Sequence, residues 1–415
     1  MHVLIFTNHF APESFRINDL AFGLVERGHE VSVVTGLPNY PKGKVFPGYG
    51  MLKRNREVIN GVSVRRIPLI PRGRGTSFNL VLNYISSAFY FCTLAPFLCR
   101  GKYDVIFVFE TSPVTIGLPA ILIKWRKKIP IVFWVLDLWP ESLSATGAVT
   151  NKSILGMVRS VVRFIYKRCD RILASSRGFD KSIHATGGYV GKVDYFPNWV
   201  EPQLESGDCD YSQLPKLPDG FRIVFTGNIG VAQDFDTILD AAEMLSDRKD
   251  IQWIIVGDGR QADRVRQEIK DRGLQHCFHL VGRYPLEAMP YFYDHADALL
   301  LPLRDEPIFA LTAPGKLSSY LASGKPVIAS INGEGADIVN QAEAGIACGA
   351  ENPTGLRDAV LQLYEKTDEE RRAMGQRGVE YARTYFDREK LFAQLEDTLN
   401  EVTGKKKKPE LVAQT

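Results

Sequence analysis

The residues of this chain whose types and spacing could do chemistry are concentrated in the segment ADALLLPLRDEPIFALTAPGKLSSYLASGKPVIAS, positions 296–330. Its apolar start predicts a buried strand, and a polar loop follows. Thr312 is placed to cap a helix that begins near Pro314, whose fixed φ suits a first helical turn. Gly315 and Lys316 would lie where unpaired N–H groups and the positive end of the helix dipole point outward. Such a helix start binds phosphate, and the lysine adds a mobile positive charge.

Glycine and polar residues also follow the other strands predicted in this half of the chain. Each loop alone is weak evidence, because tight turns use glycine freely. Together they are stronger, because the carboxyl ends of parallel strands meet at one edge of a sheet, where ligands bind. Arg260 also follows a strand, but we favour a solvated surface position for it. The candidates for ligand contact are Gly227, Asn228, Gly230 and Gln233 after the first strand, Gly257 and Asp258 after the second, Arg283 after the third and Glu306 after the fourth.

Length and composition indicate a globular protein of two domains. The chain has 415 residues, 45% hydrophobic and 24% charged, with a net charge of only +3. This balance and the absence of nucleic-acid-binding motifs argue against a nucleic-acid partner. Six scattered cysteines predict a reduced protein without structural zinc, and the N-terminus lacks the pattern of a signal peptide. We therefore expect a cytoplasmic location.

Basic residues surround one uncharged stretch, residues 77–99. Nine lysines and arginines lie between Lys42 and Arg74, against the single acid Glu57. The stretch is long enough to span a membrane, but it contains several Asn and Ser residues and Pro96. Three alternatives stay open: a core helix, a membrane-interfacial helix, and a true span.

Strand and helix patterns alternate along both halves of the chain, which predicts parallel sheets with right-handed crossovers. We expect an α/β fold with two facing, doubly wound Rossmann-like domains and a cleft between them. The expected boundaries are an N-terminal domain (1–197), a linker (198–220), a C-terminal domain (221–385), a helix packing back on the first domain (386–403) and a basic disordered tail (404–415).

In the first domain, four polar residues follow predicted strands and could contact a substrate. Asp137 ends the strand predicted at 129–136, and Glu141 lies just beyond it. His9 and Glu13 lie at the first strand–helix turn. For Glu13 the alternative is an acid that complements the helix dipole. No motif indicates a metal site.

Taken together, the motifs resemble those of glycosyltransferase family 4, a family of retaining enzymes with the two-Rossmann GT-B fold. In the second half the matching motifs are FTGNIG, VGDG, HADALLLP and PGKLSSYLASGKPVIAS. In the first half they are FAPES, RGHEVSVVTG, LDLWPES and FPNWVEP. The similarity extends over residues 1 to about 400 and is closest in character to the WbuB-like branch of bacterial polysaccharide transferases.

The resemblance implies roles for several residues and shows two departures. Glu306 corresponds to the first glutamate of the family's pair, beside the donor sugar, but the second glutamate is Ser319 here. The Arg and Lys that many relatives carry between positions 228 and 234 are also missing. Lys316 is then the main candidate for holding the leaving diphosphate, and Arg283 is second.

The function that the resemblance implies is retaining transfer of a sugar from a nucleotide sugar, which we expect to be a UDP-sugar, without a metal or other cofactor. The expected acceptor is a lipid-linked saccharide of O-antigen, capsule or exopolysaccharide synthesis. We expect the protein to bind peripherally to the cytoplasmic face of the inner membrane, where it would meet this acceptor. The alternatives are a nucleotide-sugar 2-epimerase and a catalytically degenerate, donor-binding scaffold subunit. Catalytic candidates are Lys316, Glu306, Asp137 and Arg283, donor-binding candidates include Thr312, Pro314, Gly315 and Ser319, and acceptor-side candidates are His9, Glu13 and Glu141.

Overall fold

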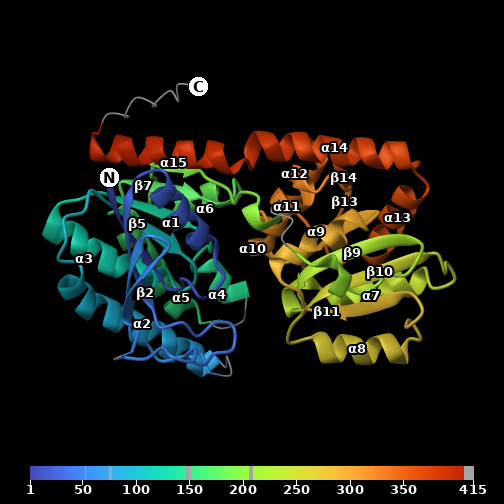
Figure 1. The fold of residues 1–415 in the computed structure, drawn as a ribbon, viewed down its shortest axis with the longest axis horizontal. Helices are drawn as coiled ribbons and strands as arrows, with labels where there is room; N and C mark the ends of the chain where they lie inside the picture. Colours follow the sequence, from blue (N-terminus) through green and yellow to red (C-terminus); the bar gives the residue numbers. More distant parts are fainter. Residues whose placement is uncertain (52, 74–76, 146–148, 150, 205–208, 406–415) are drawn as a thin grey trace. The chain divides into compact units, whose positions relative to one another are not determined.

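The chain folds into two compact units, each built around its own sheet (Figure 1). The computed structural model describes residues 1–405 except 52, 74–76, 146–148, 150 and 205–208. Arg74 and most of the expected basic tail therefore lie outside the described residues. Unit 1 comprises Met1–Ser175, Phe179–Phe196 and the chain from Glu389 onward, and unit 2 comprises Ser176–Gly178 and Pro197–Arg388. The segment expected as a linker is thus grouped with unit 2.

The described part of unit 1 contains an eight-stranded sheet in the order β3-β4-β2-β1-β5-β6-β7-β8. Neighbouring strands are parallel except β3, which pairs antiparallel with β4 around a turn at Gly61 (φ +79°). Every residue of β5 and β6 is buried, as expected for central parallel strands covered on both faces. The strands are β1 (His2–Thr7), β2 (Glu30–Gly36), β3 (Arg56–Ile59), β4 (Val62–Ile67), β5 (Val105–Glu110), β6 (Ile131–Val135), β7 (Arg171–Ala174) and β8 (Val193–Tyr195).

Helices connect the strands of unit 1, and the last helix of the chain also packs in this unit. His29 Nε2 lies 2.8 Å from Glu396 of that helix, and Gln394 Nε2 donates to the Tyr195 carbonyl at 2.8 Å. The helices are α1 (Arg16–Glu26), α2 (Ser77–Leu98), η1 (Val114–Ile116), α3 (Gly117–Lys127), α4 (Glu141–Ala145), α5 (Lys152–Tyr166), α6 (Phe179–Gly187) and α15 (Arg388–Thr403).

Helix α2 buries three polar side chains, Asn83, Ser86 and Ser87, and exposes several apolar ones. Asn83 donates to the Ile70 carbonyl at 2.6 Å, and Ser87 donates to the side chain of Asn8 at 3.2 Å. The opposite face exposes five apolar residues at helical spacing: Phe78, Val81, Ile85, Phe89 and Phe97, of which Phe78 is 70% exposed. Among the described helices, α2 alone (Phe78–Leu98) is long and apolar enough to cross a bilayer, which by itself is weak evidence that it does.

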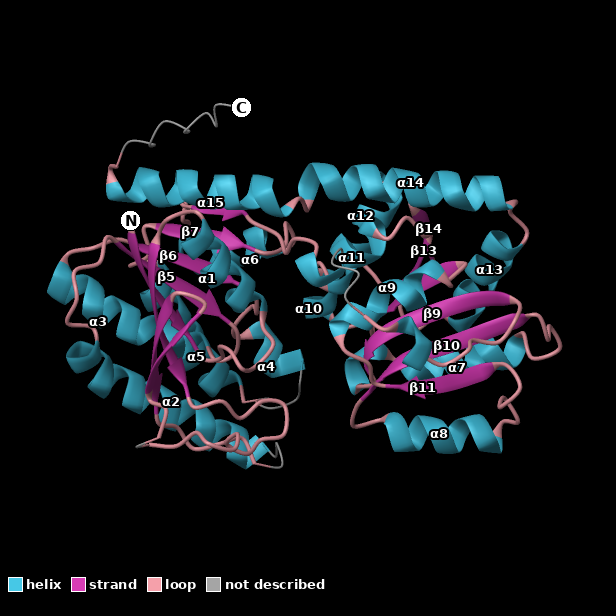
Figure 2. Ribbon diagram, in the orientation of Figure 1, coloured by secondary structure: helices cyan, strands magenta, loops and turns pink. Residues whose placement is uncertain are grey.

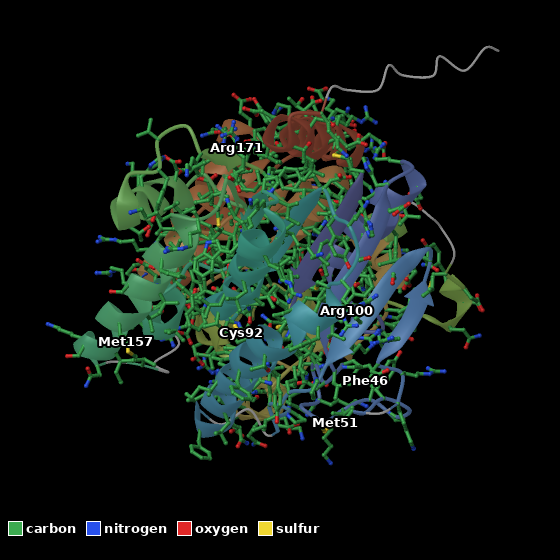
Figure 3. The ribbon with its side chains drawn as sticks, turned by 90° about the vertical axis from the view of Figure 1, so that its left-hand side faces the viewer. Phe46, Met51, Cys92, Arg100, Met157 and Arg171 are labelled. Atoms are coloured by element: carbon green, nitrogen blue, oxygen red, sulfur yellow. The ribbon has the colours of Figure 1, made fainter. Side chains whose placement is uncertain are left out.

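Figure 3 labels several side chains of unit 1, among them Cys92 on α2. In the same view Met51 projects from the loop before β3 and Met157 projects from α5. Both methionines are more than half exposed. Exposed apolar side chains of unit 1 therefore occur on several segments and not on α2 alone.

The described part of unit 2 contains a fully parallel six-stranded sheet in the order β11-β10-β9-β12-β13-β14. Successive residues of a strand point to opposite faces, so Ile223 and Phe225 pack in one hydrophobic cluster and Val224 in the other. Helices flank the strands in Figure 2. The strands are β9 (Phe221–Asn228), β10 (Ile251–Asp258), β11 (Phe278–Gly282), β12 (Ala298–Pro302), β13 (Val327–Ser330) and β14 (Gly345–Ala347).

The helices of unit 2 include several short turns at the carboxyl ends of the strands. They are η2 (Pro202–Leu204), η3 (Tyr211–Gln213), η4 (Val231–Gln233), α7 (Phe235–Met244), α8 (Ala262–Asp271), η5 (Leu286–Ala288), α9 (Met289–Asp294), α10 (Pro307–Ala310), α11 (Lys316–Ala322), α12 (Glu334–Gln341), α13 (Pro353–Tyr364) and α14 (Asp368–Tyr385). The expected fold class, two doubly wound α/β domains, is confirmed by these two sheets.

Candidate functional site

The carboxyl edge of the unit 2 sheet gathers most of the residues that the sequence singles out. Strand order reverses between β9 and β12, because β10 and β11 extend the sheet on one side of β9 and β13 and β14 on the other. In open parallel sheets, ligands bind outside the carboxyl ends of the strands at such a switch point. The loops after β9 and β12 are therefore the best-placed ones for a ligand.

Lys316, the first residue of α11, reaches back to the end of β9. Its Nζ donates to the Thr226 carbonyl at 2.8 Å and lies 4.1 Å from the centre of the Phe225 ring. Burial lowers the pKa of Lys316 to about 7, because the charged ammonium loses hydration. The lysine therefore exchanges its proton near neutral pH and would regain its charge beside an anion.

The glycines at the strand ends lie against neighbouring atoms that a side chain would meet. At Gly227 (φ +138°) a side chain would place its Cβ 2.7 Å from the Lys316 Nζ, so the missing side chain makes room for the lysine. At Gly257 a Cβ would lie 1.8 Å from the Gly227 carbonyl oxygen, so this glycine allows β9 and β10 to approach each other. At Gly230 a Cβ would lie 2.4 Å from the Asn228 amide. Gly227 thus bears directly on the candidate site, whereas Gly257 serves the sheet.

Around the β9 loop, Gln233 lies in the 3-10 turn η4 and does not open the following helix, which begins at Phe235. Its Oε1 is buried and has no hydrogen-bond partner among the described residues. Asn228 and Asp258 are exposed, and Asp258 accepts a hydrogen bond from the Gly259 N–H at 2.8 Å. Arg283 is exposed after β11, with no ion pair to any described residue.

The segment between β12 and α11 differs from the expectation in one respect. Residues Pro307–Ala310 form a short helix, α10, with Glu306 at its N-cap position. Thr312 does not cap the next helix: its hydroxyl donates to the Ile308 carbonyl at 2.7 Å, one turn back. The predicted Thr312 cap was therefore wrong, because the α10 turn supplies a nearer acceptor. Pro314 and Gly315 precede α11, which begins at Lys316 with Gly315 as its N-cap and no side-chain cap.

Ser319 lies one turn after Lys316 and binds a carboxylate that the sequence did not suggest. Its hydroxyl donates to Glu201 Oε2 at 2.5 Å. Glu201 belongs to the FPNWVEP segment, 118 positions earlier in the chain. The place where the family resemblance implied a glutamate thus holds a serine with a carboxylate from another segment.

In unit 1, His9 and Glu13 form a buried chain of hydrogen bonds with Arg72. Arg72 Nη2 lies 3.2 Å from His9 Nε2, and since a guanidinium can only donate, this ring nitrogen is the acceptor. A neutral His9 then donates from Nδ1 to Glu13 Oε2 at 3.1 Å. Glu13 Oε1 accepts from the backbone N–H groups of Asn39 and Tyr40 at 2.8 and 2.7 Å. Glu13, 2% exposed, therefore fixes the β2 loop and the histidine, and it precedes α1 instead of lying in its first turn.

Asp137 follows β6 and is held by two serines. Its carboxylate accepts hydrogen bonds from the hydroxyls of Ser112 and Ser142, and the Trp139 indole donates to Ser112 Oγ at 3.0 Å. The backbone N–H of Asp137 donates to Glu110 Oε2 at 3.2 Å. Asp137 is partly exposed, and each of its carboxylate oxygens is held by one of these serines.

Glu110, the last residue of β5, is a fully buried acid that sequence reasoning missed. Desolvation raises the pKa of Glu110 well above its usual value, and the charge of Asp137 adds to the effect. Burial therefore favours the neutral, protonated form of this carboxyl group. The sequence feature that could have indicated this buried acid is its position as the last residue of the otherwise apolar run VIFVFE.

Glu141 begins α4 and accepts a hydrogen bond from Ser182 Oγ at 3.3 Å. Its other carboxylate oxygen is buried without a partner among the described residues. Arg72 appeared in the sequence only as part of a basic region, and nothing there indicated its contact with His9. In the described part of the chain, no three His, Cys, Asp or Glu side chains are grouped as metal ligands would be.

Two family models match the chain. One, described as "Glycosyl transferase 4-like domain", matches residues 14–199, and the other, described as "Glycosyl transferases group 1", matches residues 220–366. The first match lies largely in unit 1 and the second lies in unit 2, so each unit is recognised separately.

Curated relatives are similar over most of their length. WcaI of Escherichia coli, named as a colanic acid biosynthesis glycosyl transferase, is 25% identical over 78% of this chain and 82% of its own. The 2-deoxystreptamine N-acetyl-D-glucosaminyltransferase of Niallia circulans is 28% identical over 84% and 87%. WbjE of Pseudomonas aeruginosa, named as a probable glycosyltransferase, is 24% identical over 64% and 68%.

Solved structures share the fold. HepE of Anabaena, in a complex with UDP, superposes with a TM-score of 0.69 at 15% identity and covers 97% of this chain and 100% of its own. Sucrose-phosphate synthase of Thermosynechococcus elongatus gives a TM-score of 0.74 at 17% identity, over 97% and 99%. A glycosyl transferase family model thus matches each unit. The chain therefore belongs to the family 4 type of glycosyltransferases, built of two parallel α/β domains of the GT-B type.

Proposed function

We propose that this glycosyltransferase moves a sugar, with retention of anomeric configuration, from a UDP-sugar bound by unit 2 to a lipid-linked saccharide bound by unit 1. The pathway would be the synthesis of a bacterial surface polysaccharide. The observation that supports the donor half most directly is the Lys316 ammonium at the carboxyl end of β9. It is a cation at the switch point of a parallel sheet, where a nucleotide diphosphate binds.

In this proposal, catalysis consists of positioning and charge stabilisation. As the bond between the sugar and the diphosphate breaks, negative charge develops on the leaving oxygen, and Lys316 stabilises it in a site that contains little water. Gln233 Oε1 and Glu306 would contact the donor as hydrogen-bond acceptors. Arg283 would supply a second positive charge from the loop after β11.

The identity of the nucleotide rests on similarity. HepE has been crystallised with UDP and with UDP-glucose, and its fold matches both units. The names of WcaI and of TuaH of Bacillus subtilis, which refer to colanic acid and to teichuronic acid biosynthesis, support a polysaccharide product.

The donor is tested by thermal shift and hydrolysis assays against UDP-, GDP- and dTDP-sugars. We expect one UDP-sugar to raise the unfolding temperature through mass action and to be hydrolysed slowly. Lys316→Ala should lose that hydrolysis. If a GDP- or dTDP-sugar stabilises the protein and no UDP-sugar does, the nucleotide assignment is wrong.

The lipid-linked acceptor is supported by the surface of unit 1. The exposed face of α2 presents Phe78, Val81, Ile85 and Phe89 to solvent, and the preceding segment is rich in Lys and Arg. This combination favours binding in the interface of an anionic membrane at the cytoplasmic face. A peripheral protein bound there would meet an acceptor whose lipid is anchored in the same membrane.

Membrane binding is tested by flotation of the full chain with vesicles that contain anionic phospholipid. Replacement of Phe78, Val81, Ile85 and Phe89 by serine should abolish flotation, because it removes apolar side chains that would insert into the membrane interface. The matched control replaces Val190 and Met244, which are exposed elsewhere, by serine and should float as the wild type does. Unchanged flotation of the α2 variant would contradict the membrane proposal.

A further inference from the structure

Arg72 lies across the switch point of the unit 1 sheet. The strand order reverses between β1 and β5, because β2, β4 and β3 extend the sheet beyond β1, whereas β6, β7 and β8 extend it beyond β5. Arg72 Nη2 lies 3.2 Å from His9 Nε2, in the loop after β1, and donates to the Ser112 carbonyl, in the loop after β5, at 3.2 Å. In open parallel sheets, ligands bind at such a point. Unit 1 therefore holds a guanidinium where its sheet is best placed to bind a ligand.

The charge of Arg72 is not paired with a carboxylate of the described residues. Both contacts of Nη2 are to neutral groups, a ring nitrogen and a backbone carbonyl. Nε is buried and has no hydrogen-bond partner in the described part of the chain, although a guanidinium offers five donors. Arg66 of the same unit differs, because its buried side chain pairs with Glu57 at 2.6 Å. A partly buried arginine without such a partner is suited to bind an anion that arrives as a ligand.

Two tyrosines lie on either contact list of this guanidinium without satisfying its charge. The guanidinium carbon lies 6.0 Å from the centre of the Tyr40 ring and 5.9 Å from the centre of the Tyr84 ring. These distances are at the limit for a cation–π attraction, so the rings alone do not account for the arginine. Burial raises the pKa of Tyr84, and the charge of Arg72 opposes this effect. The Tyr84 phenol therefore stays neutral and does not compete with an anion for the donors of Arg72.

Ser112 connects Arg72 to the acceptor-side candidate Asp137. Its carbonyl accepts from Arg72, and its hydroxyl donates to the Asp137 carboxylate. One residue after β5 thus contacts both a cation and an anion of the site. An anionic group bound at Arg72 and a sugar hydroxyl bound at Asp137 would therefore belong to neighbouring parts of one ligand.

We propose that Arg72 binds a phosphate group of the acceptor and thereby makes unit 1 specific for a phosphorylated saccharide. A guanidinium pairs with a phosphate through two parallel N–H···O bonds, which fixes the orientation of the phosphate as well as its position. A saccharide that is joined to its lipid through phosphate carries this group beside its first sugar, within reach of Asp137 when the phosphate lies at Arg72. The inference rests on the proposed function, since it assigns the phosphate to the acceptor.

The experiment titrates the full chain with farnesyl diphosphate and with farnesol by calorimetry, in the presence of UDP. We expect Arg72→Met to bind farnesyl diphosphate about tenfold more weakly than the wild type or worse, because the pair between guanidinium and phosphate is lost. Arg72→Lys keeps the charge but not the planar fork, so it should recover part of the affinity. Farnesol, which has no phosphate, should not distinguish the variants. Arg100→Met removes an exposed arginine of the same unit and is the matched control, which should bind as the wild type does.

Binding of UDP to each variant reports separately on the fold and on the donor site of unit 2. If UDP binding is retained but the wild type and Arg72→Met bind farnesyl diphosphate equally, or if the wild type does not bind it, the role of Arg72 is refuted. Inorganic pyrophosphate identifies the source of the phosphate. If it binds as tightly as farnesyl diphosphate and depends on Arg72 equally, the phosphate subsite stands but serves a soluble acceptor. If UDP does not bind the wild type while farnesyl diphosphate still depends on Arg72, the proposed donor site fails and the phosphate subsite stands.

Discussion

Binding of UDP should be coupled to the uptake of a proton by Lys316. Burial lowers the pKa of Lys316 to about 7, so at pH 8 only about a tenth of the free protein carries a charged Lys316. A bound diphosphate stabilises the ammonium and raises its pKa again. We therefore expect uptake of close to one proton per UDP at pH 8.

The affinity should follow the same equilibrium. UDP binds the form of the protein in which Lys316 is protonated, and the fraction of that form falls as the pH rises above 7. The dissociation constant of UDP should therefore rise about 50-fold between pH 7 and pH 9. Lys316→Met cannot take up a proton and should bind UDP weakly, with an affinity that is nearly independent of pH over this range. The phosphate of UDP itself titrates near pH 6, which makes pH 8 the better condition.

Isothermal titration in buffers with different ionisation enthalpies measures the number of protons taken up. The dependence of the apparent binding enthalpy on the buffer gives that number directly, for the wild type and for Lys316→Met. If the wild type takes up no proton at pH 8 while Lys316→Met loses affinity, then Lys316 is already charged in the free protein. In that case the contact with the Thr226 carbonyl would outweigh burial, and our reasoning would be refuted.

The same pKa has a consequence for stability. Between pH 7 and 10.5 the unfolded chain holds a proton on Lys316 that the folded protein has released, so the free energy of unfolding should rise with pH across this window. The difference between the two pKa values corresponds to about 5 kcal/mol at most, and partial solvent exposure of the side chain reduces it. Lys316→Met should lack this rise, which urea unfolding at pH 7 and pH 10 would show.

Three further predictions concern positions in both units. Glu110→Gln should raise the unfolding free energy at pH 8 but have little effect at pH 4.5. The reason is that the raised pKa of Glu110 in the folded protein makes the wild type lose stability as the pH rises above the pKa of Glu110 in the unfolded chain. Urea titrations at the two pH values test this. Gly257→Ala should cost about 3 kcal/mol or more, since its Cβ would meet a β9 carbonyl at 1.8 Å, whereas Gly156→Ala, with open space around it in α5, should stabilise by about 0.5–1 kcal/mol in thermal unfolding. Asp137→Asn should abolish transfer to the acceptor while leaving hydrolysis of the donor unchanged; parallel loss of both activities would remove Asp137 from the acceptor side.

Periodic apolar patterns were sufficient to predict the architecture. Short runs such as those at β1, β5 and β9 are bounded by glycine or polar residues, and parallel strands buried on both faces must be apolar throughout. The sequence also singled out Lys316, because a lysine at a helix start beside a strand end has few structural uses, and its ammonium lies at the end of β9. The prediction of a Thr312 cap was wrong because Pro307, a residue suited to a first helical turn, begins the short helix α10. The Thr312 hydroxyl donates to a carbonyl of that helix.

The orientation of α2 could not be read from the sequence. An uncharged helix with interspersed Asn and Ser is consistent with either face being buried, because both faces contain apolar residues. The deciding contacts are long-range: Ser87 bonds Asn8 of the β1 loop, and Asn83 bonds the carbonyl of Ile70. Once these polar groups are satisfied inside, the aromatic and branched side chains are left outside, which is the arrangement that a membrane interface favours.

The contact between Lys316 and Thr226 changes what the sequence implied about the donor site. The absence of the family's upstream cations suggested that Lys316 must hold a larger share of the charge of the leaving diphosphate than in typical relatives, with Arg283 as the second candidate. In the structure its ammonium instead donates to a backbone carbonyl and lies over the Phe225 ring, in a place that lowers its pKa. The charge is therefore not permanent, and it is formed most readily when an anion arrives. A cation that strengthens as negative charge develops stabilises the transition state more than the free enzyme, which is the requirement for catalysis. By this argument, substitution of Lys316 should lower the rate of transfer more than it weakens binding of the intact nucleotide sugar.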